Sequence, residues 1–127
     1  MVILAELLCF EGKMKEASVV IRKLNSGYKK FNILGLMYLQ NFRFSFDRSR
    51  DFDNFYDLQG SDYFLLNSKK NFSQSNSDFN NNIQSIMGLI LVSFFQKDWK
   101  TYSVKFSLLK NQIKNKVIKN IFIIFRV

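Results

Sequence analysis

The chain has 127 residues, 47% of them hydrophobic, and a formal net charge of +9, so it is long enough for one hydrophobic core and its charge favours anionic partners. It contains no His, so the commonest general base is absent. Cys9 is its single cysteine, which excludes both an intrachain disulfide and a cysteine-based metal cluster. We find no paired carboxylates, phosphate-binding glycine loop or nucleophile elbow. The sequence therefore predicts a protein that is not an enzyme, with no cofactor and no small-molecule substrate.

The first forty residues predict three helices. Residues 2–11 place Leu4, Leu7 and Leu8 on one helical face, and Gly12 ends that run. A second helix over residues 13–25 carries an apolar stripe at spacings of three and four, formed by Met14, Ala17, Ile21 and Leu24. Residues 31–40 are mostly apolar and predict a third, buried helix.

Residues 42–58 predict a β-hairpin. Phe42, Phe44 and Phe46 fall at every second position, which is the period of a strand with one buried face. Arg48 and Arg50 continue the alternation, and residues 51–54 supply turn-forming side chains. The arginines would make a basic tip, which either contacts nucleic acid or is simply solvated.

Residues 59–82 are polar and compositionally biased, and they predict a loop or insertion. An apolar helix is expected at 83–97, followed by an amphipathic helix that begins at Trp99 or Lys100. The lysines of this last helix could dock on RNA, lie on an acidic membrane or be solvated. The longest apolar runs are too short for a membrane span, so no membrane partner is expected.

Parts of the chain resemble the tetratricopeptide repeat, which would make it a protein-interaction scaffold. Residues 4–17 are similar to its helix–turn–helix, residues 34–38 to its opening, and residues 88–99 to a third copy. Three observations oppose this interpretation: the period is not constant, the alternating phenylalanines are typical of a strand, and the positive charge has no role in it.

A second resemblance covers the whole chain. The resemblance depends on four landmarks in order along the chain. The first two are residues 12–17, which follow a helix, and an Arg-Ser-Arg stretch at 48–50 that is followed by residues 56–58. The last two are a hydrophobic helix at 86–95 followed by residues 100–109, and a terminal segment at 120–127 that contains aromatic residues and an arginine. In this order they are similar to small-subunit ribosomal protein seven, the universal uS-seven family. The Asp53-Asn54 pair replaces the Gly-Gly hairpin tip of that family.

The resemblance implies a single, mainly α ribosomal-protein domain over residues 1–127, with one protruding β-hairpin. The implied function is that of a structural constituent of the small ribosomal subunit, which binds the 3′ major domain of the rRNA and supports head assembly beside neighbouring ribosomal proteins. Its hairpin would lie near the exit-site tRNA and the mRNA path. The AT-rich codon bias suggested by the abundance of Phe, Asn, Lys and Ile fits a mitochondrial ribosome, with an AT-rich bacterium or another organelle as runner-up.

Lysine and arginine neutralise phosphates, so the basic residues are the candidate contacts. The expected hairpin contacts are Arg43, Arg48 and Arg50. The expected rRNA contacts are Lys13, Lys15, Arg22, Lys23, Lys29, Lys30, Lys100, Lys114, Lys116, Lys119 and Arg126.

Overall fold

The computed structural model describes the backbone of residues 1–52 and 55–125 and the side chains of residues 1–44 and 62–115. Over these backbone ranges the chain is helical and contains no strand, so the expectation of a mainly α protein is confirmed. The helices in chain order are α1 (Val2–Phe10), α2 (Met14–Arg22), α3 (Tyr28–Phe52), α4 (Phe55–Asp78), α5 (Ile83–Gln96) and α6 (Trp99–Phe125). The five helices that the sequence predicts are all present, with their ends shifted by a few residues or, for α3, extended.

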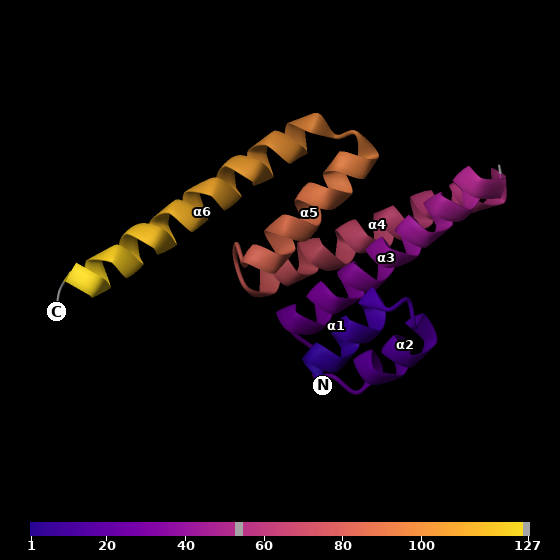
Figure 1. Cartoon of the computed structure of the whole chain (residues 1–127), viewed down its shortest axis with the longest axis horizontal. Helices are drawn as coiled ribbons and strands as arrows, with labels where there is room; N and C mark the ends of the chain where they lie inside the picture. The colour runs from indigo at the N-terminus through magenta and orange to yellow at the C-terminus, as the bar shows by residue number, and fades with distance from the viewer. Residues whose placement is uncertain (53–54, 126–127) are drawn as a thin grey trace.

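The helices follow one another as three hairpins, α1 with α2, α3 with α4, and α5 with α6 (Figure 1). The first hairpin packs on α3, and α5 packs on both α3 and α4. Helix α6 runs back along α5 and then extends away from the other helices (Figure 1). The Gln112 Nε2 atom of α6 donates a hydrogen bond of 2.9 Å to the Asn81 carbonyl, which lies just before α5.

The turns within the first and third hairpins have the same hydrogen-bond pattern. After α1, the backbone N–H of Gly12 donates to Cys9 O and that of Lys13 donates to Leu8 O. After α5, Lys97 N–H donates to Phe94 O and Asp98 N–H donates to Ser93 O in the same three- and five-residue spans. This is the Schellman pattern, and it needs a residue with positive φ. Gly12 has φ +80° and Lys97 has φ +59°.

The buried side chains form two clusters that meet along α3. One joins α1, α2 and α3 through Ala5, Cys9, Ala17, Ile21 and Ile33. The other joins α3, α4 and α5 through Leu39, Phe42, Leu65, Phe72, Leu89 and Val92. Because α3 belongs to both clusters, it holds the first hairpin against the rest of the molecule.

The predicted β-hairpin at 42–58 is wrong, because residues 42–52 belong to α3 and residues 55–58 to α4. Residues 36–59 contain neither Gly nor Pro, and a helix that has already begun adds residues at little cost. Phe42 continues a helical row from Leu39 and is 5% exposed, whereas Phe44 points to another side and is 42% exposed. The alternation of phenylalanines therefore does not form one buried face. Residues 53–54, where the hairpin tip was expected, lie outside the described residues.

The predicted loop at 59–82 is also wrong over most of its length, since residues 59–78 are part of α4. Among the described side chains of this helix, residues 62–78, the buried ones are Leu65, Ser68, Phe72 and Ser75, which recur every three or four residues. Two of these four are serines, so hydrophobicity alone does not reveal the buried face. Ser68 is small enough to sit against α3, where its Oγ donates a hydrogen bond of 2.8 Å to the Gly35 carbonyl.

Candidate partner-binding surface

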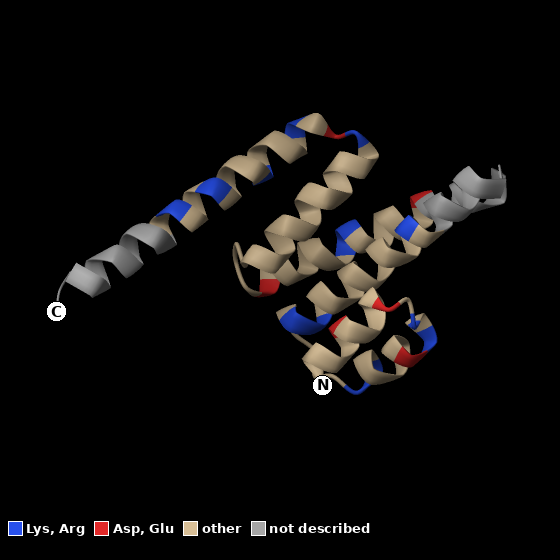
Figure 2. Ribbon diagram, viewed as in Figure 1, with Lys and Arg blue, Asp and Glu red and all other residues tan. Residues whose placement is uncertain are grey.

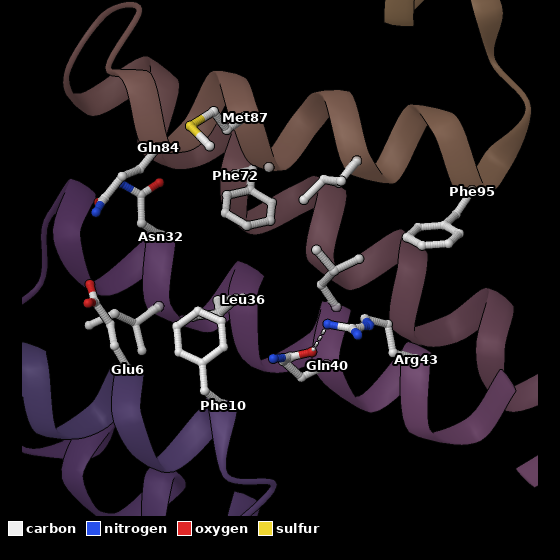
Figure 3. Close-up of a pocket in the computed structure, with 14 residues that line it drawn as sticks. Glu6, Phe10, Asn32, Leu36, Gln40, Arg43, Phe72, Gln84, Met87 and Phe95 are labelled. Carbon is white, nitrogen blue, oxygen red and sulfur yellow. Dashed lines mark hydrogen bonds between the residues drawn. The ribbon is translucent and has the colours of Figure 1, made fainter. Parts of the chain in front are cut away.

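A pocket of about 510 Å³ opens between α1, α3 and α5 (Figure 3). Its walls are mostly apolar, and Phe72 of α4 also reaches it. Phe10 of α1 and Met87 and Leu91 of α5 line the pocket and remain exposed to solvent, Phe10 by 62% and the other two by about half. A pocket of this size and polarity falls in the range of ligand and peptide sites. We call it the α1–α3–α5 pocket.

Charged and polar groups lie at two sides of the pocket. Figure 3 shows Glu6 of α1 on one side and Arg43 of α3 on the other. The Arg43 Nη1 atom donates a hydrogen bond of 3.1 Å to Gln40 Oε1, which fixes the guanidinium at the wall. A bound chain with charges of both signs would therefore be oriented in the pocket, because each charge has a preferred side.

Asn32 forms part of the polar wall and is 6% exposed. Its Nδ2 atom donates to Asn82 Oδ1 at 3.1 Å and to Gln84 Oε1 at 3.2 Å. Its Oδ1 atom is buried and accepts no hydrogen bond from the described residues. These bonds tie α3 to the first turn of α5 and so hold two walls of the pocket together.

Cys9 does not line the pocket and is fully buried in the cluster that joins α1, α2 and α3. Burial raises the pKa of its thiol to about 11, and the nearby Glu6 carboxylate adds to this effect. Thiolate, not thiol, is the nucleophilic form. The arrangement supports the sequence-based interpretation of Cys9 as a core residue.

The predicted rRNA contacts whose side chains are described lie on two separate parts of the fold. Among residues 1–44, Lys15, Arg22, Lys23 and Lys29 are exposed on or beside α2 and at the start of α3. The Lys13 Nζ atom pairs with the Glu11 carboxylate at 3.3 Å, and Lys30 Nζ donates to the Leu24 carbonyl at 3.3 Å. Lys100 and Lys114 are exposed on α6, which is a separate part of the molecule (Figure 2).

Other predicted contacts fall where side chains are not described. Arg48 and Arg50 belong to α3, and Lys116 and Lys119 belong to α6, but their side chains lie outside the described residues. Arg126 lies outside them altogether. Arg43, expected on a hairpin, is instead an exposed residue of α3 at the edge of the pocket.

The sequence did not reveal the pocket. Met87 and Leu91 were expected in a buried helix, yet both are about half exposed on α5. Residues 2–11 were expected to form an apolar helix with Leu4, Leu7 and Leu8 on one face, but α1 leaves four large apolar side chains exposed, namely Ile3, Leu4, Leu7 and Phe10. A run that is apolar on more than one face is a signal of a second contact surface, and it is present in both segments.

The described residues contain neither a metal-ligand cluster nor a helix that could cross a membrane. They contain no group of three or more His, Cys, Asp or Glu side chains placed to hold a metal ion. They also contain no helix of the length and apolarity that crossing a membrane requires.

The chain was compared with known protein families, curated proteins and solved structures, and none of the three comparisons found a match. The resemblances to ribosomal protein seven and to the tetratricopeptide repeat therefore stay predictions from the sequence.

Proposed function

We propose that this protein is a helical-hairpin scaffold that binds a partner polypeptide in the α1–α3–α5 pocket. The observation that carries this proposal is that the first helices of three successive hairpins line one mostly apolar hollow of about 510 Å³. Such a hollow accepts apolar side chains, and its polar edges can bind a peptide backbone. The role is one of binding and not of catalysis.

The arrangement of the hairpins supports the tetratricopeptide-like alternative more than the sequence did. Each first helix packs on the first helix of the next hairpin, α1 on α3 and α3 on α5. The second helix of each hairpin also packs on the next first helix, α2 on α3 and α4 on α5. The strand-like phenylalanines no longer oppose this interpretation, since Phe42 and Phe44 lie in α3. The unequal lengths still depart from a regular repeat, because α1 has 9 residues and α3 has 25.

The chemistry of the pocket indicates what the partner must offer. Phe10, Met87 and Leu91 require an apolar side chain that can be buried among them. Arg43 favours an acidic group on one side, and Glu6 favours a basic group on the other. The net charge of +9 would speed the approach of an acidic partner at low salt.

A random peptide library displayed on phage and selected against the full chain tests this proposal. The variants Met87→Asp and Leu91→Asp place a charge at the apolar rim, and both sites are exposed enough to spare the core. Leu66→Asp is the matched control, because Leu66 is exposed on α4 and does not line the pocket. We expect selected peptides to lose at least about tenfold in affinity for the two pocket variants and to bind the control unchanged. Peptides that bind all three variants equally, or no enrichment at all, would contradict the proposal.

The second candidate is a structural role in the small subunit of a mitochondrial ribosome, where the protein would bind the rRNA. The observation that favours it is the charge of the chain after Asp98, which contains no Asp or Glu and carries Lys100, Lys105, Lys110, Lys114, Lys116, Lys119 and Arg126. The ribosomal candidate is weakened because residues 42–52 and 55–58 are helical and not a β-hairpin. That hairpin was one of the landmarks of the resemblance and the part of the protein expected to contact tRNA and mRNA.

Two measurements test the ribosomal candidate. The tagged protein should co-sediment with small subunits, together with neighbouring ribosomal proteins. Its affinity for small-subunit rRNA should fall by roughly three to five decades between low and moderate salt if six to ten phosphates are neutralised. A protein that sediments free of ribosomes and shows no salt-dependent RNA binding would exclude this role.

A further inference from the structure

One side of the α5–α6 hairpin is an exposed apolar surface that the pocket does not include. Phe94 of α5 and Trp99, Phe106 and Ile113 of α6 are each between 44% and 54% exposed. Four large apolar side chains on adjacent helices are thus about half exposed to solvent, which indicates a surface that a partner covers.

The aromatic rings of this surface are in contact with one another. The ring centroids of Phe94 and Trp99 are 5.8 Å apart, and those of Trp99 and Tyr102 are 5.9 Å apart. Tyr102 and Phe106 are 5.9 Å apart with an angle of 15° between their planes, so they are stacked. The rings therefore form one continuous surface that crosses from α5 onto α6.

The apolar residues of α6 have the spacing of a helix–helix contact. They recur at intervals of three and four residues, as the a and d positions of a heptad do, and they are Trp99, Tyr102, Phe106, Leu109 and Ile113. We call this row the α6 seam. Two members of the seam, Tyr102 and Leu109, are half-buried, and so are Thr101, Lys105, Leu108 and Gln112 on the side of α6 next to it. The α6 seam therefore lies at the edge of the α5–α6 contact and remains partly open.

Positive charge surrounds this seam. Between Trp99 and Asn115 the helix carries Lys100, Lys105, Lys110 and Lys114 and no acidic residue (Figure 2). At 100° per residue, Lys105 and Lys110 fall on the two sides of the seam. Lys69 of α4 is also close to the start of α6, since it and Lys100 help to lower the pKa of Asp98, after the larger effect of hydrogen bonds from Thr101.

We propose that the α6 seam, together with Phe94, binds an acidic amphipathic helix of a partner protein. The apolar stripe of that helix would cover the rings and Ile113, and its Glu or Asp side chains would lie beside Lys105 and Lys110. This surface is separate from the α1–α3–α5 pocket, so the inference goes beyond the proposed function and does not require it.

Two other occupants fit the surface less well. A second copy of this chain would bring an equally basic α6 against the first, and like charges at a contact oppose association. Single-stranded nucleic acid would match the lysines and could stack on rings, but Leu109 and Ile113 extend the seam with side chains that have no ring to stack on. An acidic helix satisfies the rings, the aliphatic residues and the lysines together.

Trp99 is the single tryptophan of the chain, so its fluorescence reports on this surface directly. The full-length protein is titrated with three probes: a designed amphipathic peptide of Leu and Glu heptads, the same peptide with Lys in place of Glu, and a uridine oligoribonucleotide. We expect saturable binding with a blue shift of Trp99 emission for the Glu peptide alone. Binding of this peptide should weaken as salt is raised, because Lys110 is exposed and Lys105 is only half-buried, so salt screens both charges.

Variants assign the binding to the seam. Phe106→Asp should weaken binding of the Glu peptide by at least about tenfold, and Val104→Asp is the control because Val104 is exposed on another side of α6. The double variant Lys105→Gln, Lys110→Gln keeps the apolar seam and should weaken the same binding, so the test does not depend on the folding of Phe106→Asp. The inference would be overturned if the Lys peptide bound as well as the Glu peptide, or if both seam variants bound the Glu peptide as the parent does. Binding of the oligoribonucleotide alone would also overturn it, because that result would indicate a nucleic-acid surface.

Discussion

The ring of Phe72 in α4 lies so close to Gly88 in α5 that a Cβ atom built on Gly88 would stand 2.5 Å from it. The same ring faces Gly35 of α3, where a Cβ atom would be 2.8 Å away. Contacts this short do not occur between real side chains, so both positions need glycine while Phe72 keeps its place. Phe72 thus fills the space where α3, α4 and α5 meet, and the two glycines make that space.

Replacing Gly88 with Ala should destabilise the protein. Alanine favours a helix by up to about 1 kcal/mol over glycine, but here its methyl group must displace a buried ring, and overpacking of a core typically costs about 1–3 kcal/mol. We expect a net loss in the free energy of unfolding, measured by urea denaturation followed by circular dichroism. Gln96→Ala, at an exposed site of the same helix, is the control. A Gly88→Ala variant more stable than the parent would show that the ring is not held against α5.

Asn82 should be the most sensitive polar residue at the junction of α3, α4 and α5. Its Oδ1 atom accepts hydrogen bonds from Ser85 N–H and Asn32 Nδ2, and its Nδ2 atom donates to Ser75 and to the Phe79 carbonyl. Loss of a helix N-cap alone costs about 1 kcal/mol, and leaving buried partners unpaired adds to it. We expect Asn82→Ala to lower the free energy of unfolding by roughly 2 kcal/mol or more. Asn80→Ala, at an exposed site, should change the free energy of unfolding little. Equal effects of Asn80→Ala and Asn82→Ala would contradict the hydrogen-bond network described for Asn82.

Cys9 should make stability fall at high pH. The pKa of its thiol is about 11 in the folded protein and 9.0 when it is not buried, so between these values the folded state holds a proton that the unfolded state has lost. Stability from this group is therefore complete below pH 9 and declines as the pH rises towards 11. Urea denaturation at several pH values should show a steeper decline for the parent than for Cys9→Ala. Identical pH profiles would mean that the thiol is not buried as described.

Phe42 and Phe44 should differ in their contribution to stability, because a helix places them on different sides. Phe42→Ala removes a buried ring and should cost about 3–5 kcal/mol. The Phe44 ring is partly exposed and rests near Gly12, where a built Cβ atom would be 3.1 Å from it, so Phe44→Ala should cost about 1 kcal/mol. Chemical denaturation of the two variants compares them directly. Equal large losses would contradict the placement of the two rings on different sides of α3.

The sequence could predict the helices whose ends are set by local chemistry. Gly12 and Asn82 mark a C-terminus and an N-terminus through backbone conformation and capping, which neighbouring residues decide. The α1–α3–α5 pocket could not be predicted in this way, because its walls come from helices far apart in the chain. The half-exposed Met87 and Leu91 look like any core residues in the sequence, and only the packing of α1, α3 and α5 places them at the wall of an open pocket.

The sequence by itself determined that the chain is mainly α, that it is strongly basic, and that α6 carries lysines beside a three- and four-residue apolar row. Local sequence permits a helix over residues 42–52, because residues 36–59 contain neither Gly nor Pro, but it does not require one there or over residues 59–78. Tertiary contacts favour the helical form where side chains are described. There, Phe42 and Leu65 pack together in one cluster, and Ser68 bonds to Gly35 across the two helices. The physical reason is that period-two phenylalanines and serine-rich segments carry weak local preferences, which the burial of rings between long helices outweighs.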